Sequence, residues 1–240
     1  MDPMLTFDSL SKYRGSRTIL TDVSFAARPG RVTGFLGPNG AGKSSTLRIL
    51  LGLDRPSSGR ALVDGVPYRS LRSPLRNVGS MLDGSGAHRS RTAADHLGWV
   101  ARSNGIARRR VGEALETVGL AGDARTRVGQ FSLGMGQRLG IAAALLGEPA
   151  TLVLDEPVNG LDPDGIRWIR ALLSAHANDG GTVLLSSHLM SEVAEIADDL
   201  VVIAGGSVVA AGPVATVTAG YATLEDAFFG LTGGAAGAGK

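Results

Sequence analysis

The chain has 240 residues, of which 43% are hydrophobic and 19% charged, a composition typical of a globular protein with one sizeable core. Its formal net charge is +2, with charges of both signs scattered along the sequence, so neither a nucleic-acid-binding stripe nor an acidic tail is indicated. Cysteine is absent, which excludes disulfides and thiolate metal sites, and the acidic start MDPMLTFDSL is unlike a signal peptide. We therefore expect a cytoplasmic protein.

Short β-branched runs alternate with helical patterns along the chain, which indicates an α/β fold with a parallel or mixed sheet and covering helices. The expected strands are RVTGFLG, RALVDG, NVGSML, TLVLDE and TVLLSSH, and the expected helices are 43–51, 92–103, 108–118, 136–147, 164–177 and 189–197. Residues 84–147 are mainly helical in this prediction, so we expect a helical subdomain inserted in the sheet domain.

The first motif is GPNGAGKS, residues 37–44, which follows an expected strand and opens an expected helix. In such a loop backbone N–H groups converge on phosphate oxygens, Lys43 reaches the β/γ-phosphates and the Ser44 hydroxyl binds Mg²⁺. A lysine is informative here because Arg supplies 21 of the 24 cationic residues, and a planar guanidinium does not replace a compact ammonium in a tight cradle. The predicted nucleotide-binding residues are Gly37, Pro38, Asn39, Gly40, Ala41, Gly42, Lys43, Ser44 and Ser45.

Two further motifs end apolar strands. In TLVLDEPVNGLD, residues 151–162, Asp155 is expected in the Mg²⁺ shell and Glu156 as the general base that polarises the attacking water. In TVLLSSH, the final His188 is expected to contact the γ-phosphate at the same sheet edge. The alternatives are a strand-end cap for the carboxylates and a structural or solvated histidine.

A second glycine-containing stretch, QFSLGMGQRLG at 130–140, leads into an apolar helix without a nearby acid, as a phosphate-binding helix start does. Together, and in this order, the motifs resemble the ATP-binding cassette family over residues 4 to about 230. The resemblance identifies 37–44 as Walker A, 151–156 as Walker B with its glutamate, 159–162 with Asp162 as the D-loop, and His188 as the switch histidine.

The resemblance implies a fold and an assembly. The fold is a P-loop NTPase core of mixed sheet and flanking helices, with an inserted helical subdomain at about 84–147 and an N-terminal antiparallel β region. One domain is expected over 1–231, followed by a flexible Gly/Ala-rich tail at 232–240. The cofactors are ATP and Mg²⁺, and two chains are expected to close head-to-tail around two ATP molecules.

FSLGMGQR falls where the family signature LSGGQ belongs, which implies that Ser132, Leu133, Gly134 and Met135 face the ATP of the partner chain. Leu133 and Met135 depart from the usual glycine and glutamine, which leaves Ser132 and Gly134 as the expected γ-phosphate contacts. Ser132 also suits a helix N-cap, which alone would explain it.

Other assignments rest on position within the family pattern. Asp83 occupies the place of the Q-loop glutamine, where it is either an Mg²⁺ ligand or only a loop residue. Tyr13 lies where the family stacks an aromatic ring on adenine, and a strand-end core aromatic is the alternative.

Several other aromatic and charged residues are also assigned from the sequence. Trp99 and Trp168 are expected in the core, Arg108 to Arg110 on a solvated helix face, and His88, Arg89 and Arg91 are candidates to face a transmembrane partner. The uncharged segment 200–224 is expected to form a strand hairpin rather than a membrane span, because Gly205-Gly206 and Gly212-Pro213 interrupt it.

Three functions are compatible with these motifs. The chain is expected to be the ATPase subunit of a membrane exporter of drugs or antibiotics, bound to the inner face of the cell membrane through a separate permease and without a nucleic-acid partner. The alternatives are a soluble cassette ATPase in DNA repair or translation, and a regulatory module that does not hydrolyse ATP. Glu156 and His188 argue against the last.

Overall fold

The computed structural model describes residues 4–82, 84, 86–188 and 190–233 of the chain. The chain divides into two compact units: unit 1 combines Met1–Leu71 with Leu173–Lys240, and unit 2 is Arg72–Leu172. Each unit combines strands with helices, which confirms the α/β prediction.

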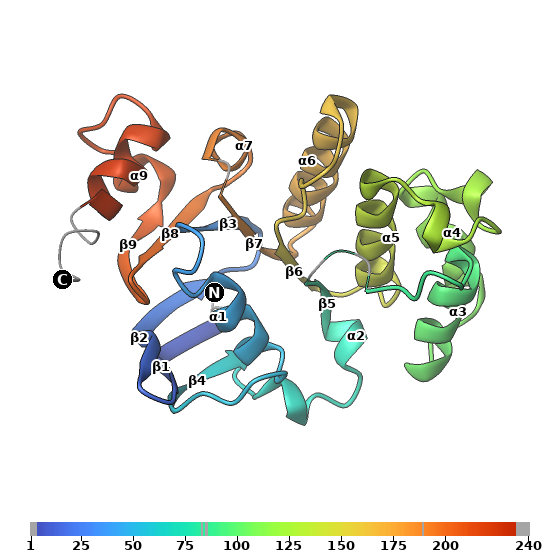
Figure 1. Ribbon diagram of the computed structural model, residues 1–240, viewed down its shortest axis with the longest axis horizontal. Helices are drawn as coiled ribbons and strands as arrows, with labels where there is room; N and C mark the ends of the chain where they lie inside the picture. Colours follow the sequence, from blue (N-terminus) through green and yellow to red (C-terminus); the bar gives the residue numbers. More distant parts are fainter. Residues whose placement is uncertain (1–3, 83, 85, 189, 234–240) are drawn as a thin grey trace. The chain divides into compact units, whose positions relative to one another are not determined.

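An antiparallel sheet with strand order β2-β1-β4 forms the N-terminal part of unit 1 (Figure 1). The strands are β1 (Leu5–Arg14), β2 (Arg17–Ala27) and β4 (Ser58–Val63). Phe7 on β1 stacks on Phe25 of β2 with ring centroids 4.1 Å apart, and both rings are buried. This sheet confirms the antiparallel region implied by the family resemblance.

Four more strands of unit 1 are ordered β7-β3-β8-β9. They are β7 (Thr182–Ser187), β3 (Arg31–Leu36), β8 (Asp199–Ala204) and β9 (Ser207–Pro213). β3 pairs in parallel with β7 and β8. Nearly every residue of β3 and β7 is buried, which explains why these strands are almost continuous apolar runs in the sequence.

The uncharged segment 200–224 contains the antiparallel hairpin of β8 and β9, as predicted. Gly205 and Gly206 form its turn with φ of 56° and 85°, and such positive values suit the two central residues of a tight hairpin turn. Within the described ranges, no helix combines the length and the apolar content that crossing a bilayer requires.

The helices of unit 1 are α1 (Lys43–Leu50), the 3-10 turn η1 (Tyr68–Ser70), α7 (Met190–Ala194), α8 (Val214–Val217) and α9 (Leu224–Gly233). α7 is shorter than the predicted helix 189–197, since it ends at Ala194 and the Ile196 N–H bonds to the Val193 carbonyl three residues earlier, as in a turn. α9 takes in the first two residues of the expected tail, and residues 234–240 lie outside the described chain.

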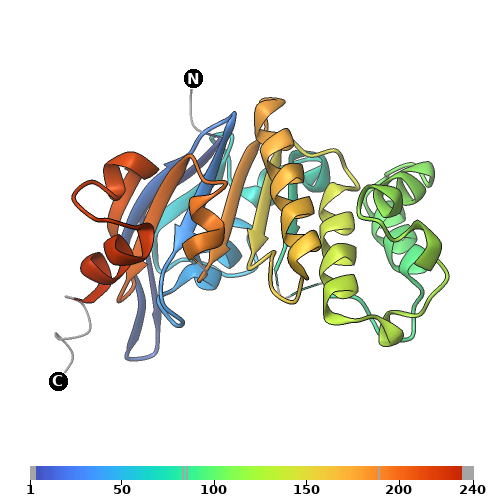
Figure 2. The ribbon, with the colours of Figure 1, turned by 90° about the horizontal axis from the view of Figure 1, so that it is seen from above.

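Unit 2 contains the parallel strand pair β5 (Val78–Met81) and β6 (Thr151–Asp155). Its helices are α2 (Pro74–Asn77), α3 (Ala93–Ser103), α4 (Arg109–Thr117) and α5 (Leu133–Leu145), with 3-10 turns η2 (Ala121–Asp123) and η3 (Val128–Gln130). The green helices α3, α4 and α5 pack on one another in Figure 2. α6 (Pro163–Asn178) begins in unit 2 and its sequence continues into unit 1.

Small residues bring α5 onto β5. A Cβ atom added to Gly140 of α5 would lie 2.6 Å from the Met81 sulfur, and one added to Gly79 of β5 would collide with the Ala144 carbonyl. Such contacts leave no room for a side chain, so the helix backbone rests directly on the strand.

Candidate functional site

The loop between β3 and α1 is a tight turn of glycines and small residues. The Ala41 N–H donates to the Pro38 carbonyl at 3.1 Å, and the Thr46 N–H donates to the Gly42 carbonyl at 2.9 Å. Gly42 has φ 111°, and a Cβ atom there would collide with the Leu20 side chain. Only glycine satisfies both the backbone angle and the space at this position.

Lys43 is the first residue of α1 and is only 6% exposed. Its Nζ donates to the Gly37 carbonyl at 2.6 Å, so the ammonium folds across the loop that precedes it. The first turn of α1 contains no acidic residue and its N-cap makes no side-chain bond. The positive end of a helix and a buried ammonium thus meet at one loop, an arrangement suited to an anion such as a phosphate.

His188 follows β7 at the same end of the sheet as this loop. β3 and β7 are parallel, and their last residues, Leu36 and Ser187, are register partners. Gly37 and His188 are the next residues of the two chain segments, and the His188 side chain is exposed. The structure therefore brings together the predicted phosphate loop and the predicted switch histidine within unit 1.

The acidic pair lies in unit 2, where β6 ends at Asp155 and Glu156 follows. Both residues are half-buried, and Glu156 has φ 50°. A non-glycine residue in this left-handed region costs about 1–3 kcal/mol and persists only where its surroundings hold it. The Glu156 carbonyl accepts from Gln137 Nε2 at 2.8 Å and from the Asn159 N–H at 3.3 Å.

Ser132 is the N-cap of α5, and its Oγ accepts from the Met135 N–H at 3.2 Å. This confirms the helix-cap alternative, and it moves the start of the helix three residues ahead of the predicted 136–147. Contact with a partner's phosphate stays a prediction. Leu133, where the family usually has glycine, is 71% exposed.

The D-loop lies against the start of α5. A Cβ atom on Gly134 would lie 2.9 Å from the Gly160 carbonyl, and one on Gly160 would collide with the Leu133 side chain. Asp162 caps α6, since its Oδ1 accepts from the Gly165 N–H at 2.7 Å. The predicted signature and the predicted D-loop are thus packed together in unit 2.

Within the described chain, no three His, Asp or Glu residues gather into a group that could hold a metal ion. Mg²⁺ is commonly held by one or two protein oxygens together with nucleotide phosphates. Ser44, exposed in the first turn of α1 in unit 1, and Asp155, at the end of β6 in unit 2, each carry an oxygen of that kind. Asp83 lies outside the described residues, so its proposed role in the Q-loop stays a prediction.

The aromatic residues differ from expectation. Tyr13, near the end of β1, is 51% exposed, so the core alternative is wrong, while adenine stacking stays a prediction. Trp99 is 54% exposed, so its core assignment is also wrong. The buried residues of α3 are Ala93, His96, Leu97 and Ala101. Trp99 lies two positions from Leu97, on another face of the helix. Trp168 is half-buried beneath the Arg138 guanidinium, 4.5 Å from its ring.

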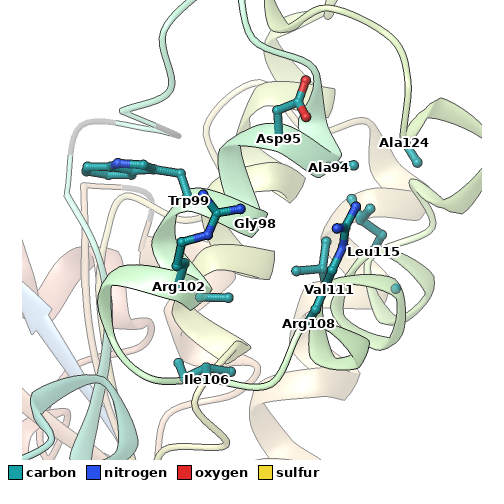
Figure 3. A pocket seen from close by; sticks show the side chains of 12 residues that line it. Ala94, Asp95, Gly98, Trp99, Arg102, Ile106, Arg108, Val111, Leu115 and Ala124 are labelled. Carbon is teal, nitrogen blue, oxygen red and sulfur yellow. The ribbon is translucent and has the colours of Figure 1, made fainter.

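A groove of about 580 Å³ lies between α3 and α4 (Figure 3). Asp95, Trp99 and Arg102 line it from α3, and Arg108 and Val111 line it from the α4 side. The Arg91 guanidinium lies 4.9 Å from the centre of the Trp99 ring. The groove therefore combines an exposed aromatic ring with charges of both signs.

The prediction that Arg108 to Arg110 are solvent-exposed is correct for only two of the three arginines. Arg108 and Arg109 are exposed. The Arg110 side chain is 19% exposed and pairs with Glu113 and with Glu148, the latter at 3.3 Å, so the solvated assignment is wrong for Arg110. This arginine holds α4 to the segment that follows α5.

The profile of the ABC transporter family matches residues 20–159, which is more than half of the chain. The chain belongs to the ABC transporter family. It is 39% identical over 206 residues to the lantibiotic transport ATP-binding protein SrtF of Streptococcus pyogenes, covering 86% of this chain and 89% of SrtF. It is 40% identical over 209 residues to the bacitracin transport ATP-binding protein BcrA of Bacillus licheniformis, covering 86% of this chain and 68% of BcrA.

Solved structures agree with this membership. An ATP-binding subunit of an ABC transporter has a TM-score of 0.86 at 26% identity and covers 95% of this chain and 99% of its own. A dimeric bacterial ABC transporter cassette has a TM-score of 0.79 at 24% identity, covers 88% of this chain and 99% of its own, and shares the fold. This ABC chain therefore has the cassette fold along nearly its whole length.

Gln137 of this ABC chain, which no sequence motif indicated, contacts the backbone of the candidate base Glu156. Gln137 is 5% exposed, on the buried face of α5 with Gly140 and Ile141, and it bonds to the backbone of Glu156. The available signal was a polar side chain on the apolar face of a helix, at positions three and four residues from buried neighbours. Its partner, a main-chain carbonyl, has no signature in the sequence.

Proposed function

We propose that this ABC protein is the ATP-hydrolysing subunit of a membrane exporter that moves an antibiotic, drug or other small molecule through a separate transmembrane subunit. The observation that carries the proposal is the register of Leu36 with Ser187, which supports a phosphate site made by residues 37–44 and His188 in a chain of this family. The named relatives, which transport lantibiotic and bacitracin, support the substrate class.

The proposed chemistry divides among the motif residues. The N–H groups of 37–44 and the Lys43 ammonium bind the β- and γ-phosphates, and Ser44 and Asp155 provide oxygens for Mg²⁺, which would neutralise charge on the transferred phosphoryl group. Glu156 orients and deprotonates the attacking water, and His188 donates a hydrogen bond to the γ-phosphate. Tyr13 stacks on the adenine.

Two copies are proposed to act together. Ser132 and Gly134 at the start of α5 contact the γ-phosphate of ATP bound to the Walker A loop of a second copy, so that each site is completed in trans. The exposure of Leu133 and the packing of Gly134 against Gly160 support an interface at this helix start. Without a nucleotide the two copies lack the phosphates that join them.

The cellular place follows from the transport role. The chain is proposed to lie in the cytoplasm against the inner face of the membrane, held by its transmembrane subunit, with His88, Arg89 and Arg91 as candidate contacts. The relatives reported above are transport subunits, which favours this proposal over a role in DNA repair or translation. A neighbouring reading frame that encodes about six apolar spans of roughly 20 residues would provide the partner for co-purification.

Glu156→Gln tests the chemistry. This variant should bind ATP, lose about 10²- to 10⁴-fold in hydrolysis and accumulate as an ATP-bound dimer, measured by phosphate release and size-exclusion chromatography. Glu148→Gln is a matched control, because Glu148 is also a glutamate with φ 50°, and it lies on the surface of the same unit. Hydrolysis by Glu156→Gln at the wild-type rate would remove Glu156 from the mechanism.

A further inference from the structure

The side-chain amide of Gln137 connects the signature helix to the proposed catalytic glutamate. Gln137 is five residues beyond the Ser132 cap and is 5% exposed. Its Nε2 donates to the Glu156 carbonyl at 2.8 Å. A buried amide that bonds to a main-chain carbonyl fixes the position of that peptide group rather than the chemistry of a side chain.

Both ends of this hydrogen bond rest on well-supported elements of unit 2. On one side, Gly140 of α5 contacts Met81 of β5, so the helix turn that follows Gln137 lies directly on the strand. On the other side, Leu154 of β6 is the register partner of Met81 and stands two residues before Glu156. The Gln137 amide therefore joins α5, which packs on β5, to the loop that follows β6, the strand paired with β5.

Glu156 has a backbone conformation that needs such support. Its φ of 50° lies in the left-handed region, which a non-glycine residue leaves for an extended conformation when its surroundings allow. Its carbonyl accepts from Gln137 on α5 and, at the longer distance of 3.3 Å, from the Asn159 N–H of the D-loop. Loss of the shorter bond lets the peptide group rotate and moves the Cα–Cβ bond that carries the carboxylate.

We infer that Gln137 is a positioning residue for Glu156, which holds the water-activating carboxylate in its reactive place and ties it to the helix that begins at Ser132. This inference rests on the proposed role of Glu156 as the general base. A shift of about 1 Å in a reacting group costs about 100-fold in rate, which sets the scale of the expected effect. In the dimer, a nucleotide held at the start of α5 would thereby also restrain Glu156 of the same chain.

The test is a double-mutant cycle in steady-state and single-turnover ATP hydrolysis. Gln137→Met keeps the length of the side chain and removes the donor, and it should lower kcat about 10- to 100-fold while the KM for ATP stays within about twofold. In the Glu156→Gln background, the same substitution should change the residual rate by less than about twofold, because no carboxylate is left to position.

Arg138→Met is the matched control for this cycle. Arg138 is the next residue of α5, and its Nη1 likewise donates to a main-chain carbonyl, that of Val118, at 3.0 Å. A change that acts through the stability of the helix should lower the rate by the same factor with and without the Glu156 carboxylate. Thermal denaturation and ATP binding are measured for every variant, and Gln137→Glu, which lacks a donor when ionised, replaces Gln137→Met if that protein does not fold.

The outcomes separate the two claims. A wild-type kcat for Gln137→Met, or an equal loss in both backgrounds, overturns the positioning role of Gln137. Near-normal hydrolysis by Glu156→Gln alone instead refutes the proposed base, whatever Gln137 does. If Gln137→Met lowers kcat only when Glu156 is intact, and leaves the KM for ATP unchanged, both the base role of Glu156 and the positioning role of Gln137 are supported.

Discussion

Ser132 offers a way to separate a structural hydrogen bond from a phosphate contact. Its Oγ caps α5 by accepting from the Met135 N–H, and the first turn of α5 has no acidic residue. Ser132→Ala removes the cap, which costs about 1 kcal/mol, or about 2–4 °C in Tm for a chain of this size. Ser132→Asp retains a cap and adds a carboxylate at the positive helix end, worth about 0.3–1 kcal/mol.

The two variants should therefore rank in opposite ways in two assays. In urea denaturation without nucleotide, Ser132→Asp should equal or exceed the wild type, and Ser132→Ala should fall below it. In size-exclusion chromatography with ATP in the Glu156→Gln background, Ser132→Asp should fail to dimerise, because its carboxylate would face the partner's γ-phosphate. Normal dimerisation of Ser132→Asp would refute the trans contact, and an unchanged stability of Ser132→Ala would refute the cap.

Lys43 and His96 are buried side chains that can carry a positive charge, and each leads to a measurable expectation. Lys43→Ala and Lys43→Arg should each lose about 10- to 100-fold in ATP affinity by calorimetry. The alanine variant lacks the ammonium, and in the arginine variant the space occupied by the 2.6 Å bond to Gly37 is too small for a guanidinium. Wild-type affinity of the arginine variant would contradict this. Burial, with a smaller effect of Arg91, lowers the pKa of His96 below its ordinary value of 6.5. The imidazole of the unfolded chain therefore binds a proton more readily than that of the folded chain. The free energy of unfolding should fall as the pH drops below about 6.5, by at most about 1.4 kcal/mol per pH unit from His96. In urea titrations between about pH 7.5 and 5.5, His96→Leu should show a smaller fall than the wild type.

Structure could be predicted from the sequence wherever the physical requirement involves only neighbouring residues. GPNGAGKS needs glycine at 42 for reasons of backbone angle and space, and it needs a compact cation at 43, so both the loop and its helix were predictable. The apolar runs of β3 and β7 likewise reported burial on both faces of a parallel pair.

Features that depend on contacts between distant segments were not predictable. The exposure of Trp99 follows from which face of α3 packs inward, and the apolar composition of the helix left that choice open. The sequence prediction began α5 three residues too late, because the first turn of the helix contains two glycines. In the structure the helix begins directly after its N-cap, Ser132. The bond from Gln137 to a carbonyl 19 residues later depends on how α5 rests on β5, which no periodicity encodes.

The pairing of β3 with β7 also has a consequence for synthesis on the ribosome. Leu36 and its register partner Ser187 are separated by roughly 150 residues, all of unit 2 among them. At about 5–20 residues per second, the segment that completes the sheet beside the phosphate loop emerges about 8–30 s after the loop itself. During that interval the apolar strand β3 lacks both of its parallel neighbours, because β7 and β8 are made later. The phosphate loop is thus made early but can bind nucleotide only after the late strands have formed the sheet beside it. Until then the exposed apolar strand is prone to aggregation, which chaperones would prevent.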